Sequence, residues 1–208
     1  MIGFYNYTVI LTYIGACSAM AGMFLAMQGK ISWAMLCLLF AGFCDMFDGT
    51  VAKTRERTVQ EKRFGIQIDS LSDLICFGVL PAVIGYNLGM KDNIFYYLVL
   101  ITFTLCALIR LAYFNVMEEE RQQTTSEPRK YYEGLPVTNV ALLLPIVYSF
   151  RRYIGLSNFT VVYAVVLAII AIAFVVKFRM VKLQMKGMLV LLALGIIELI
   201  WFLMEFNV

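Results

Sequence analysis

Four of the five aspartates in this 208-residue chain lie between positions 45 and 73, in two rows with helical spacing. Asp45 and Asp48 are three residues apart, and Asp69 and Asp73 are four apart. Residues at these spacings share one face of an α-helix. A charged side chain at the centre of a membrane helix costs about 2.5–3.5 kcal/mol by insertion scales. Carboxylates retained at the ends of two long apolar runs therefore indicate a functional site.

The chemistry that suits clustered carboxylates is the binding of divalent metal ions. The chain has no histidine, which removes the commonest general base and the commonest zinc ligand. Its five cysteines form no Cys-x-x-Cys pair, and we interpret them as buried apolar side chains. Oxygen donors alone favour Mg²⁺ or Mn²⁺, and four carboxylates can hold two ions for an in-line phosphoryl displacement. The predicted metal ligands are Asp45, Asp48, Asp69 and Asp73.

Small residues continue the two acidic faces. Gly49 and Ala52 lie one turn after the first two aspartates, and Gly65 lies one turn before the third. They leave room for a bulky group above the metals, although glycine and alanine in membrane helices more often serve helix packing. The basic loop that begins at Lys53 would attract an anionic group, with anchoring of the membrane topology as the alternative role.

Composition places these residues in a membrane protein. The chain is 62% hydrophobic and 15% charged, and several apolar runs reach the ~18–20 residues that span a bilayer. We expect an all-α, polytopic membrane helical bundle, one domain over residues 1–208, with about seven spans. The net charge of +3 comes from short loops and does not indicate a nucleic-acid partner. The expected spans are 7–27, 31–53, 65–88, 93–117, 136–150, 159–176 and 187–206.

The distribution of basic residues predicts the orientation. With the N-terminus in the cytosol, the inside loops carry twelve basic residues and the outside loops four, which the positive-inside rule favours. Asp45 lies eight residues before Lys53, about 12 Å along a helix, and Asp73 lies eight residues after Gly65. Both acidic rows can therefore face one pocket near the cytosolic surface.

Two residues inside the apolar runs stand out. Pro81 is expected to distort the third span, a distortion that membrane helices tolerate. Arg110 lies within the fourth span, about seven residues from its cytosolic end. Its side chain could simply snorkel to the membrane interface. We favour a functional interpretation, in which Arg110 pairs with a carboxylate or phosphate of the substrate.

The motif as a whole resembles a known signature. Asp-x-x-Asp-Gly-x-x-Ala-Lys, an eleven-residue spacer and Gly-x-x-x-Asp-x-x-x-Asp are similar to the pattern of the CDP-alcohol phosphatidyltransferases, membrane enzymes of phospholipid synthesis. The chain departs at Lys53, where the family usually has arginine, and in the spacer 54–64, which is longer. Lysine keeps the charge but lacks the planar fork of arginine. Within the family the chain is most similar to bacterial-type phosphatidylserine synthases, at 69–82, 109–116 and 134–136.

The resemblance implies a reaction, a fold and residue roles. The phosphatidyl group of CDP-diacylglycerol would pass to the hydroxyl of L-serine, giving phosphatidylserine and CMP, with Mg²⁺ or Mn²⁺ as cofactor. The fold would be a six-helix core with an additional C-terminal helix, forming a homodimer in the cell (inner) membrane with its active site facing the cytosol. The implied roles are metal binding for Asp45, Asp48 and Asp69, the general base for Asp73, the cytidine pocket for Gly49, Ala52 and Gly65, and a phosphate contact for Lys53.

Other functions fit parts of the pattern. The same chemistry could use another acceptor alcohol, such as glycerol phosphate or inositol phosphate. A divalent-cation transporter with a carboxylate relay belongs to a different class, and it predicts acidic groups near the bilayer midplane with a path to both sides. Because all four aspartates lie toward one surface, the transporter is the weaker alternative, and a purely structural scaffold is weaker still.

Overall fold

The computed structural model describes residues 3–124, 131–181 and 185–206, and within them every predicted apolar run is helical. This confirms the all-α architecture. Arg129, Lys130 and Lys182, which belong to the charge count above, lie outside the described residues. The helices are α1 (Ile10–Met27), α2 (Ile31–Ala52), α3 (Val59–Asp73), α4 (Leu80–Asn87), α5 (Ile94–Thr124), α6 (Val140–Ser149), α7 (Arg151–Ile154), α8 (Leu156–Val175) and α9 (Met185–Phe206).

Five of the described helical stretches are long and apolar enough to cross a membrane, and two shorter apolar helices accompany them. The protein is therefore a polytopic helical membrane protein. The third stretch starts at Val59, six residues before the expected start, because Thr58 and Glu61 form a capping box. The five stretches are Tyr7–Met27, Ile31–Ala52, Val59–Asn87, Ile94–Arg121 and Asn158–Val175, and the shorter helices are Val137–Ser149 and Ala193–Phe202.

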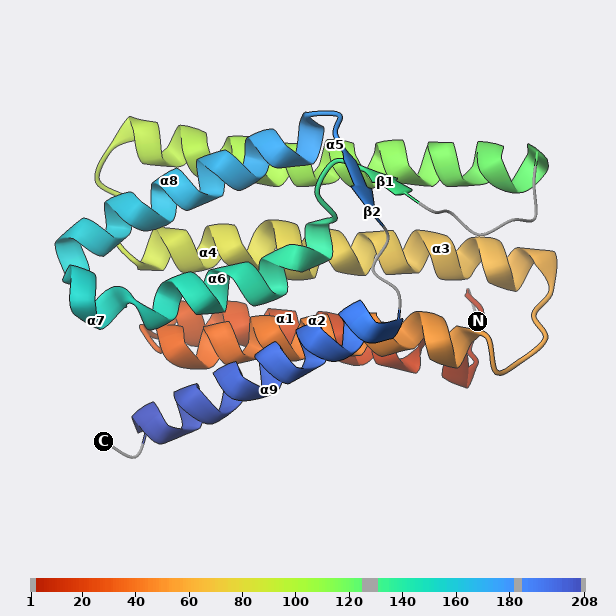
Figure 1. The fold of residues 1–208 in the computed structure, drawn as a ribbon, viewed down its shortest axis with the longest axis horizontal. Helices are drawn as coiled ribbons and strands as arrows, with labels where there is room; N and C mark the ends of the chain where they lie inside the picture. Colours follow the sequence, from red (N-terminus) through yellow and green to blue (C-terminus); the bar gives the residue numbers. More distant parts are fainter. Residues whose placement is uncertain (1–2, 125–130, 182–184, 207–208) are drawn as a thin grey trace.

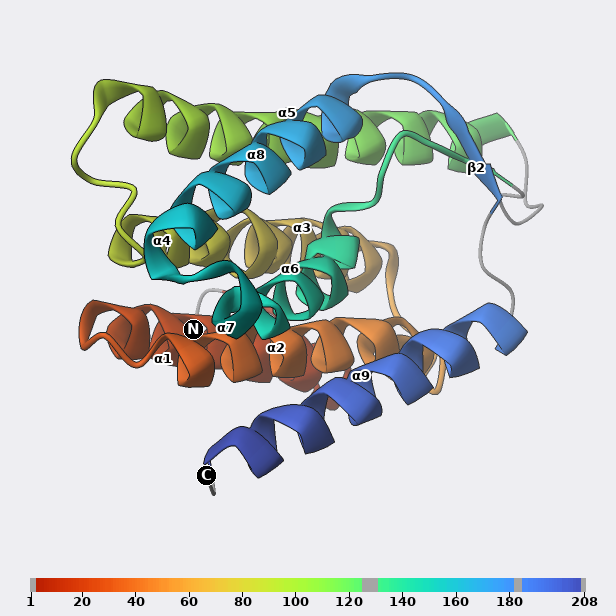
Figure 2. The ribbon, with the colours of Figure 1, turned by 60° about the vertical axis from the view of Figure 1, so that its left-hand side comes forward.

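The helices run roughly along one axis, so that their connections gather at two ends (Figure 1). At one end lie the 28–30 and 88–93 turns and α7. The 53–58 connection lies at the other end. Two short strands, β1 (Tyr131–Glu133) and β2 (Arg179–Val181), pair antiparallel in the same half of the bundle, set back from that end. Helix α8 crosses α5, and α9 crosses α2 and α6 on the opposite side of the bundle (Figure 2). The loops predicted to be basic thus lie in the same half of the bundle.

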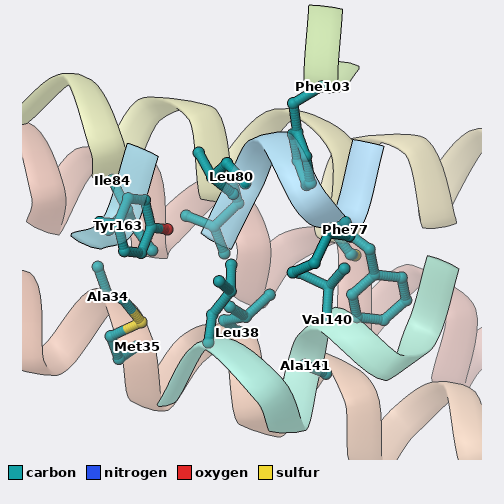
Figure 3. Close-up of a cluster of buried hydrophobic side chains, with 14 of the residues drawn as sticks. Ala34, Met35, Leu38, Phe77, Leu80, Ile84, Phe103, Val140, Ala141 and Tyr163 are labelled. Carbon is teal, nitrogen blue, oxygen red and sulfur yellow. The ribbon is translucent and has the colours of Figure 1, made fainter. Parts of the chain in front are cut away.

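The core lies where α2, the third span, α6 and α8 meet (Figure 3). Close helix packing is possible because small residues face each other. A Cβ atom added to Gly42 of α2 would lie 2.5 Å from the Cβ of Ala141 in α6. This contact holds α2 close against α6 at a position one turn before Asp45. The labelled core side chains are Ala34, Met35, Leu38, Phe77, Leu80, Ile84, Phe103, Val140, Ala141 and Tyr163.

A π-helical segment, Leu74–Val79, joins α3 to α4 directly after the last aspartate. The N–H of Leu80 donates to the carbonyl of Ile75, five residues back, in place of the α-helical spacing of four. The hydroxyl of Thr104 in α5 donates to the carbonyl of Gly78 at 3.1 Å. This side-chain partner stabilises the widened turn, which precedes Pro81. The distortion expected from Pro81 therefore takes the form of a π-bulge, a feature that is frequent at functional sites.

Glu198 of α9 is a buried carboxyl group in an apolar environment. Its side chain is 8% exposed, and both carboxylate oxygens lack a hydrogen-bond partner among the described residues. A buried polar group without a partner costs about 1–3 kcal/mol. We therefore expect Glu198→Leu to raise the thermal unfolding midpoint of the detergent-solubilised protein, with Glu198→Gln as the control that keeps a polar group. A lower midpoint for Glu198→Leu would show that the carboxyl group stabilises the fold.

Candidate active site

The four aspartates of the motif meet in one pocket between α1, α2 and α3. The pocket has an empty volume of about 180 Å³, and all four carboxyl groups line it. Across the α2–α3 interface, Asp45 faces Asp73 and Asp48 faces Asp69. The structure thus brings the two acidic rows together. The remaining lining residues are Leu11, Thr12, Gly15, Ala41, Cys44, Ser72, Cys76 and Phe77.

Three of the carboxylates are close enough to share one cation. Asp45, Asp48 and Asp69 each offer an oxygen, and these oxygens all lie within 4.8 Å of one another. Asp73 is outside this group and lies against Asp45. The Oδ1 atom of Asp69 is buried without a hydrogen-bond partner among the described residues. An all-oxygen donor set with a buried, unsatisfied acceptor fits a hard divalent cation such as Mg²⁺ or Mn²⁺.

Two hydroxyl residues that the sequence did not single out hold the acidic cluster in place. The Oγ1 atom of Thr12 in α1 donates to Oδ2 of Asp48 at 3.1 Å. The Oγ atom of Ser72 donates to the backbone carbonyl of Thr12 at 3.2 Å. Together they tie the acidic faces of α2 and α3 to α1. Ser72 lies between Asp69 and Asp73 of the motif, but the sequence around Thr12 carries no comparable signal.

The small and basic candidates lie outside the lining of the pocket, and along α2 and α3 they are nearer than the aspartates to the 53–58 connection. A Cβ atom added to Gly49 would meet no atom within 4 Å, so the space beside it is open. Ala52 is half-buried, and Lys53 is exposed at the C-terminus of α2. A Cβ atom added to Gly65 would lie 3.1 Å from Nη1 of Arg57, a residue the sequence analysis did not single out as a candidate.

Arg110 lies in α5 and also outside the pocket lining. Its side chain is 6% exposed, its Nε donates to the carbonyl of Leu135 at 3.3 Å, and its guanidinium lies 5.5 Å from the ring centroid of Phe114. A side chain that is buried in this way does not snorkel to the interface. Its partner Leu135 belongs to the Gly134–Leu135–Pro136 segment. Gly134 has a φ of +73°, a conformation that favours glycine.

A further polar contact joins the site to α5. The Oγ atom of Ser70, next to Asp69, donates to Oδ1 of Asn115 at 3.0 Å. Two residues earlier in α5, the Tyr113 hydroxyl donates to Glu133 at 2.9 Å, and the Lys177 ammonium lies 5.2 Å from the Tyr113 ring centroid. The hydrogen bond with Tyr113 raises the pKa of Lys177 above its ordinary value. This network fixes the β1 region beside the cytosolic end expected for α5.

Comparison with known proteins gives a consistent set of relatives. A protein named CDP-diacylglycerol–serine O-phosphatidyltransferase from Saccharomyces cerevisiae is 39% identical over 123 residues, which cover 58% of this chain and 43% of the yeast protein. The archaetidylserine synthase of Methanothermobacter thermautotrophicus is 31% identical over 156 residues, covering 75% and 63% of the two chains. A CDP-diacylglycerol–serine O-phosphatidyltransferase from Methanocaldococcus jannaschii is 32% identical over 135 residues, covering 65% and 58%.

The matched region is thus less than two thirds of the length of each of these relatives. All three names contain serine. Two of them name CDP-diacylglycerol, and the third names an archaetidyl lipid. None of the three names describes a transporter, so the divalent-cation transporter gains no support from them. The family model for CDP-alcohol phosphatidyltransferases matches residues 5–205, nearly the whole chain. With the two aspartate rows assembled in one pocket, this match identifies the chain as a member of the CDP-alcohol phosphatidyltransferase family.

Proposed function

We propose that this protein transfers the phosphatidyl group from CDP-diacylglycerol to the hydroxyl of L-serine, giving phosphatidylserine and CMP. The observation that carries the proposal is the pocket in which Asp45, Asp48, Asp69 and Asp73 converge from two helices. Membership of the family supports the transfer chemistry. The names of the relatives support serine as the acceptor.

The acidic cluster would hold the metal cofactor, two ions of Mg²⁺ or Mn²⁺. Asp45, Asp48 and Asp69 would be the principal ligands, because their oxygens are mutually close, and Asp73 would complete the set. When bound, the cations neutralise negative charge on the diphosphate of the substrate. The hydrogen bond from Thr12 holds Asp48 in the orientation that this role requires.

In the proposed reaction, Asp73 accepts the proton of the serine hydroxyl. The serine oxygen forms a bond to the phosphorus that carries the diacylglycerol, and the bond from this phosphorus to the bridging oxygen breaks. CMP leaves with the electron pair of that bond. Asp73 suits the role of base because it lines the pocket but stands outside the group of three closest carboxylates. A positioned base contributes about 10²–10⁴-fold to such a step.

The surrounding residues would bind the rest of the substrates. Gly49, Ala52 and Gly65 would make room for the cytidine, and Lys53 would contact a phosphate. We assign Arg110 to the carboxylate of serine or a substrate phosphate, since it is a buried cation of α5, the helix that the Ser70–Asn115 hydrogen bond joins to the site. We further propose one domain over residues 1–208, a homodimer, and an active site that faces the cytosol at the inner membrane, as the distribution of basic residues favours.

The proposal is tested by CMP release from the purified protein in detergent with CDP-diacylglycerol and Mn²⁺. Serine, glycerol 3-phosphate and inositol phosphate are offered in separate reactions. We expect release with serine only. Release with one of the other alcohols would keep the transferase chemistry and replace the acceptor. A folded protein that binds Mn²⁺ but releases no CMP with any of the three would contradict the proposal.

A further inference from the structure

Arg57 differs from the other cations of the basic connection between α2 and α3. Its side chain is half-buried, whereas the other four cations of this region are exposed. Within the described part of the chain, Arg57 makes no hydrogen bond or ion pair, although the neighbouring Arg55 pairs with Glu61 at 3.5 Å. A half-buried guanidinium without a protein partner has its donors available for a ligand. The exposed cations are Lys53, Arg55, Lys62 and Arg63.

The guanidinium of Arg57 lies over Gly65. Its Nη1 atom would be 3.1 Å from a Cβ atom at that position, so the missing side chain of glycine is what admits it. Gly65 lies one turn before Asp69 in α3, on the same helix face. On the α2 side, the space next to Gly49 is open. Arg57 therefore lies against α3 one helical turn before Asp69, outside the residues that line the pocket.

The connection that carries Arg57 is held by the N-terminal segment. The Nδ2 atom of Asn6 donates to Glu61 at 3.2 Å, and the hydroxyls of Tyr7 and Thr54 are 2.9 Å apart. Glu61 also accepts a hydrogen bond from the backbone N–H of Thr58 at 2.8 Å. These contacts fix the residues on both sides of Arg57. The backbone that carries Arg57 is therefore held at this position, which lowers the entropic cost of binding a ligand there.

We propose that Arg57 binds the phosphate of the CMP half of the CDP-lipid, which is the leaving group of the reaction. The inference rests on the proposed function and adds to it a binding residue from the spacer between the two halves of the motif. The planar fork of arginine can donate two parallel hydrogen bonds to a phosphate. Negative charge develops on this phosphate as the bond to the diacylglycerol-linked phosphorus breaks, so Arg57 stabilises both the bound substrate and the departing CMP.

The test compares Arg57→Ala and Arg57→Lys with Arg63→Ala, a control that removes the same charge from an exposed position nearby. CMP release is measured against the CDP-diacylglycerol concentration in mixed micelles and against serine, and CMP is titrated as a product inhibitor. For Arg57→Ala we expect the KM for CDP-diacylglycerol and the inhibition constant of CMP each to rise about tenfold or more. Arg57→Lys should lie between wild type and Arg57→Ala, and the KM for serine should not change.

The outcomes separate this proposal from the proposed function. Equal constants for Arg57→Ala and Arg63→Ala, with both variants folded and active, would overturn the role of Arg57 while leaving the transferase in place. A rise in the KM for serine alone would also overturn it. If the wild-type protein released no CMP, calorimetric titration with CMP and Mn²⁺ would still decide the point, since the proposal requires Arg57→Ala to weaken CMP binding. Unchanged thermal midpoints establish that the variants are folded.

Discussion

Asp73→Asn is expected to lower the rate of CMP release by about 10²–10⁴-fold, the contribution typical of a general base. Asparagine has nearly the same shape as aspartate, so the pocket keeps its packing, but it cannot accept the proton of the serine hydroxyl. Because Asp73 lies outside the group of three mutually close carboxylates, the substitution should leave most of the Mn²⁺ binding in place. The measurements are initial rates at saturating CDP-diacylglycerol and serine, and the thermal midpoint with and without Mn²⁺.

A matched control for this variant is Asp92→Asn. Asp92 is exposed in the turn between α4 and α5, at the end of the bundle opposite to the 53–58 connection. The Asp92→Asn substitution removes the same chemical group at a distance from the pocket, and the activity of this variant should equal that of the wild type. An Asp73→Asn protein with more than about a tenth of the wild-type rate would argue against the assignment as general base. Loss of the Mn²⁺-dependent stabilisation would instead show that Asp73 is as important for metal binding as Asp45, Asp48 and Asp69.

Asp69→Asn is expected to lose metal binding and activity together. Its Oδ1 atom is buried without a hydrogen-bond partner among the described residues, and its carboxylate belongs to the group of three. Substitution of a residue that merely supports a metal ligand costs about 10–100-fold in affinity or activity, so loss of a ligand should cost at least as much. At a free metal concentration of one hundred times the dissociation constant, bound metal adds about 2.7 kcal/mol to the stability of the fold. This stabilisation should be absent in Asp69→Asn.

Chelation offers an independent check of the same site. Excess EDTA should abolish CMP release by the wild-type protein, and Mg²⁺ or Mn²⁺ should restore it. The thermal midpoint of the wild type should fall on chelation, whereas that of Asp69→Asn should not change. A wild-type enzyme that retains full activity in excess chelator would refute the metal-dependent mechanism. An Asp69→Asn protein that Mn²⁺ still stabilises to the wild-type extent would remove Asp69 from the set of ligands.

Much of this architecture could be predicted from the sequence because its signals are local. Continuous apolar runs mark the helices of a membrane protein, and steps of three and four residues place Asp45 with Asp48 and Asp69 with Asp73. Spans two and three follow each other through a short connection, so their acidic faces were expected to meet. The early start of α3 at Val59 also had a local signal, the Thr-x-x-Glu capping box at Thr58, but the polar residues after it favoured a loop.

The remaining features depend on contacts between segments distant in sequence. Thr12 reaches Asp48 from a different helix, and nothing in the pattern around Thr12 indicates it. The pairing of β1 with β2 joins segments separated by α6, α7 and α8. Arg57 was one of five similar cations in the sequence, and only the packing of its connection against Gly65 distinguishes it. The burial of Arg110 likewise depends on the segment that contains Leu135.

The π-helical turn that follows Asp73 allows one continuous helix to direct its acidic face into the pocket and its apolar face into the core, although the two faces do not share one α-helical phase. One residue corresponds to about 100° of rotation about an α-helix. The additional residue within Leu74–Val79 therefore resets the angular phase between the acidic row of α3 and the apolar row of α4, which contains Leu80 and Ile84. The orientation of the carboxylates on α3 is consequently independent of the face that α4 packs against the core. Selection can adjust the face that α4 presents to the bundle without turning the carboxylates away from their pocket.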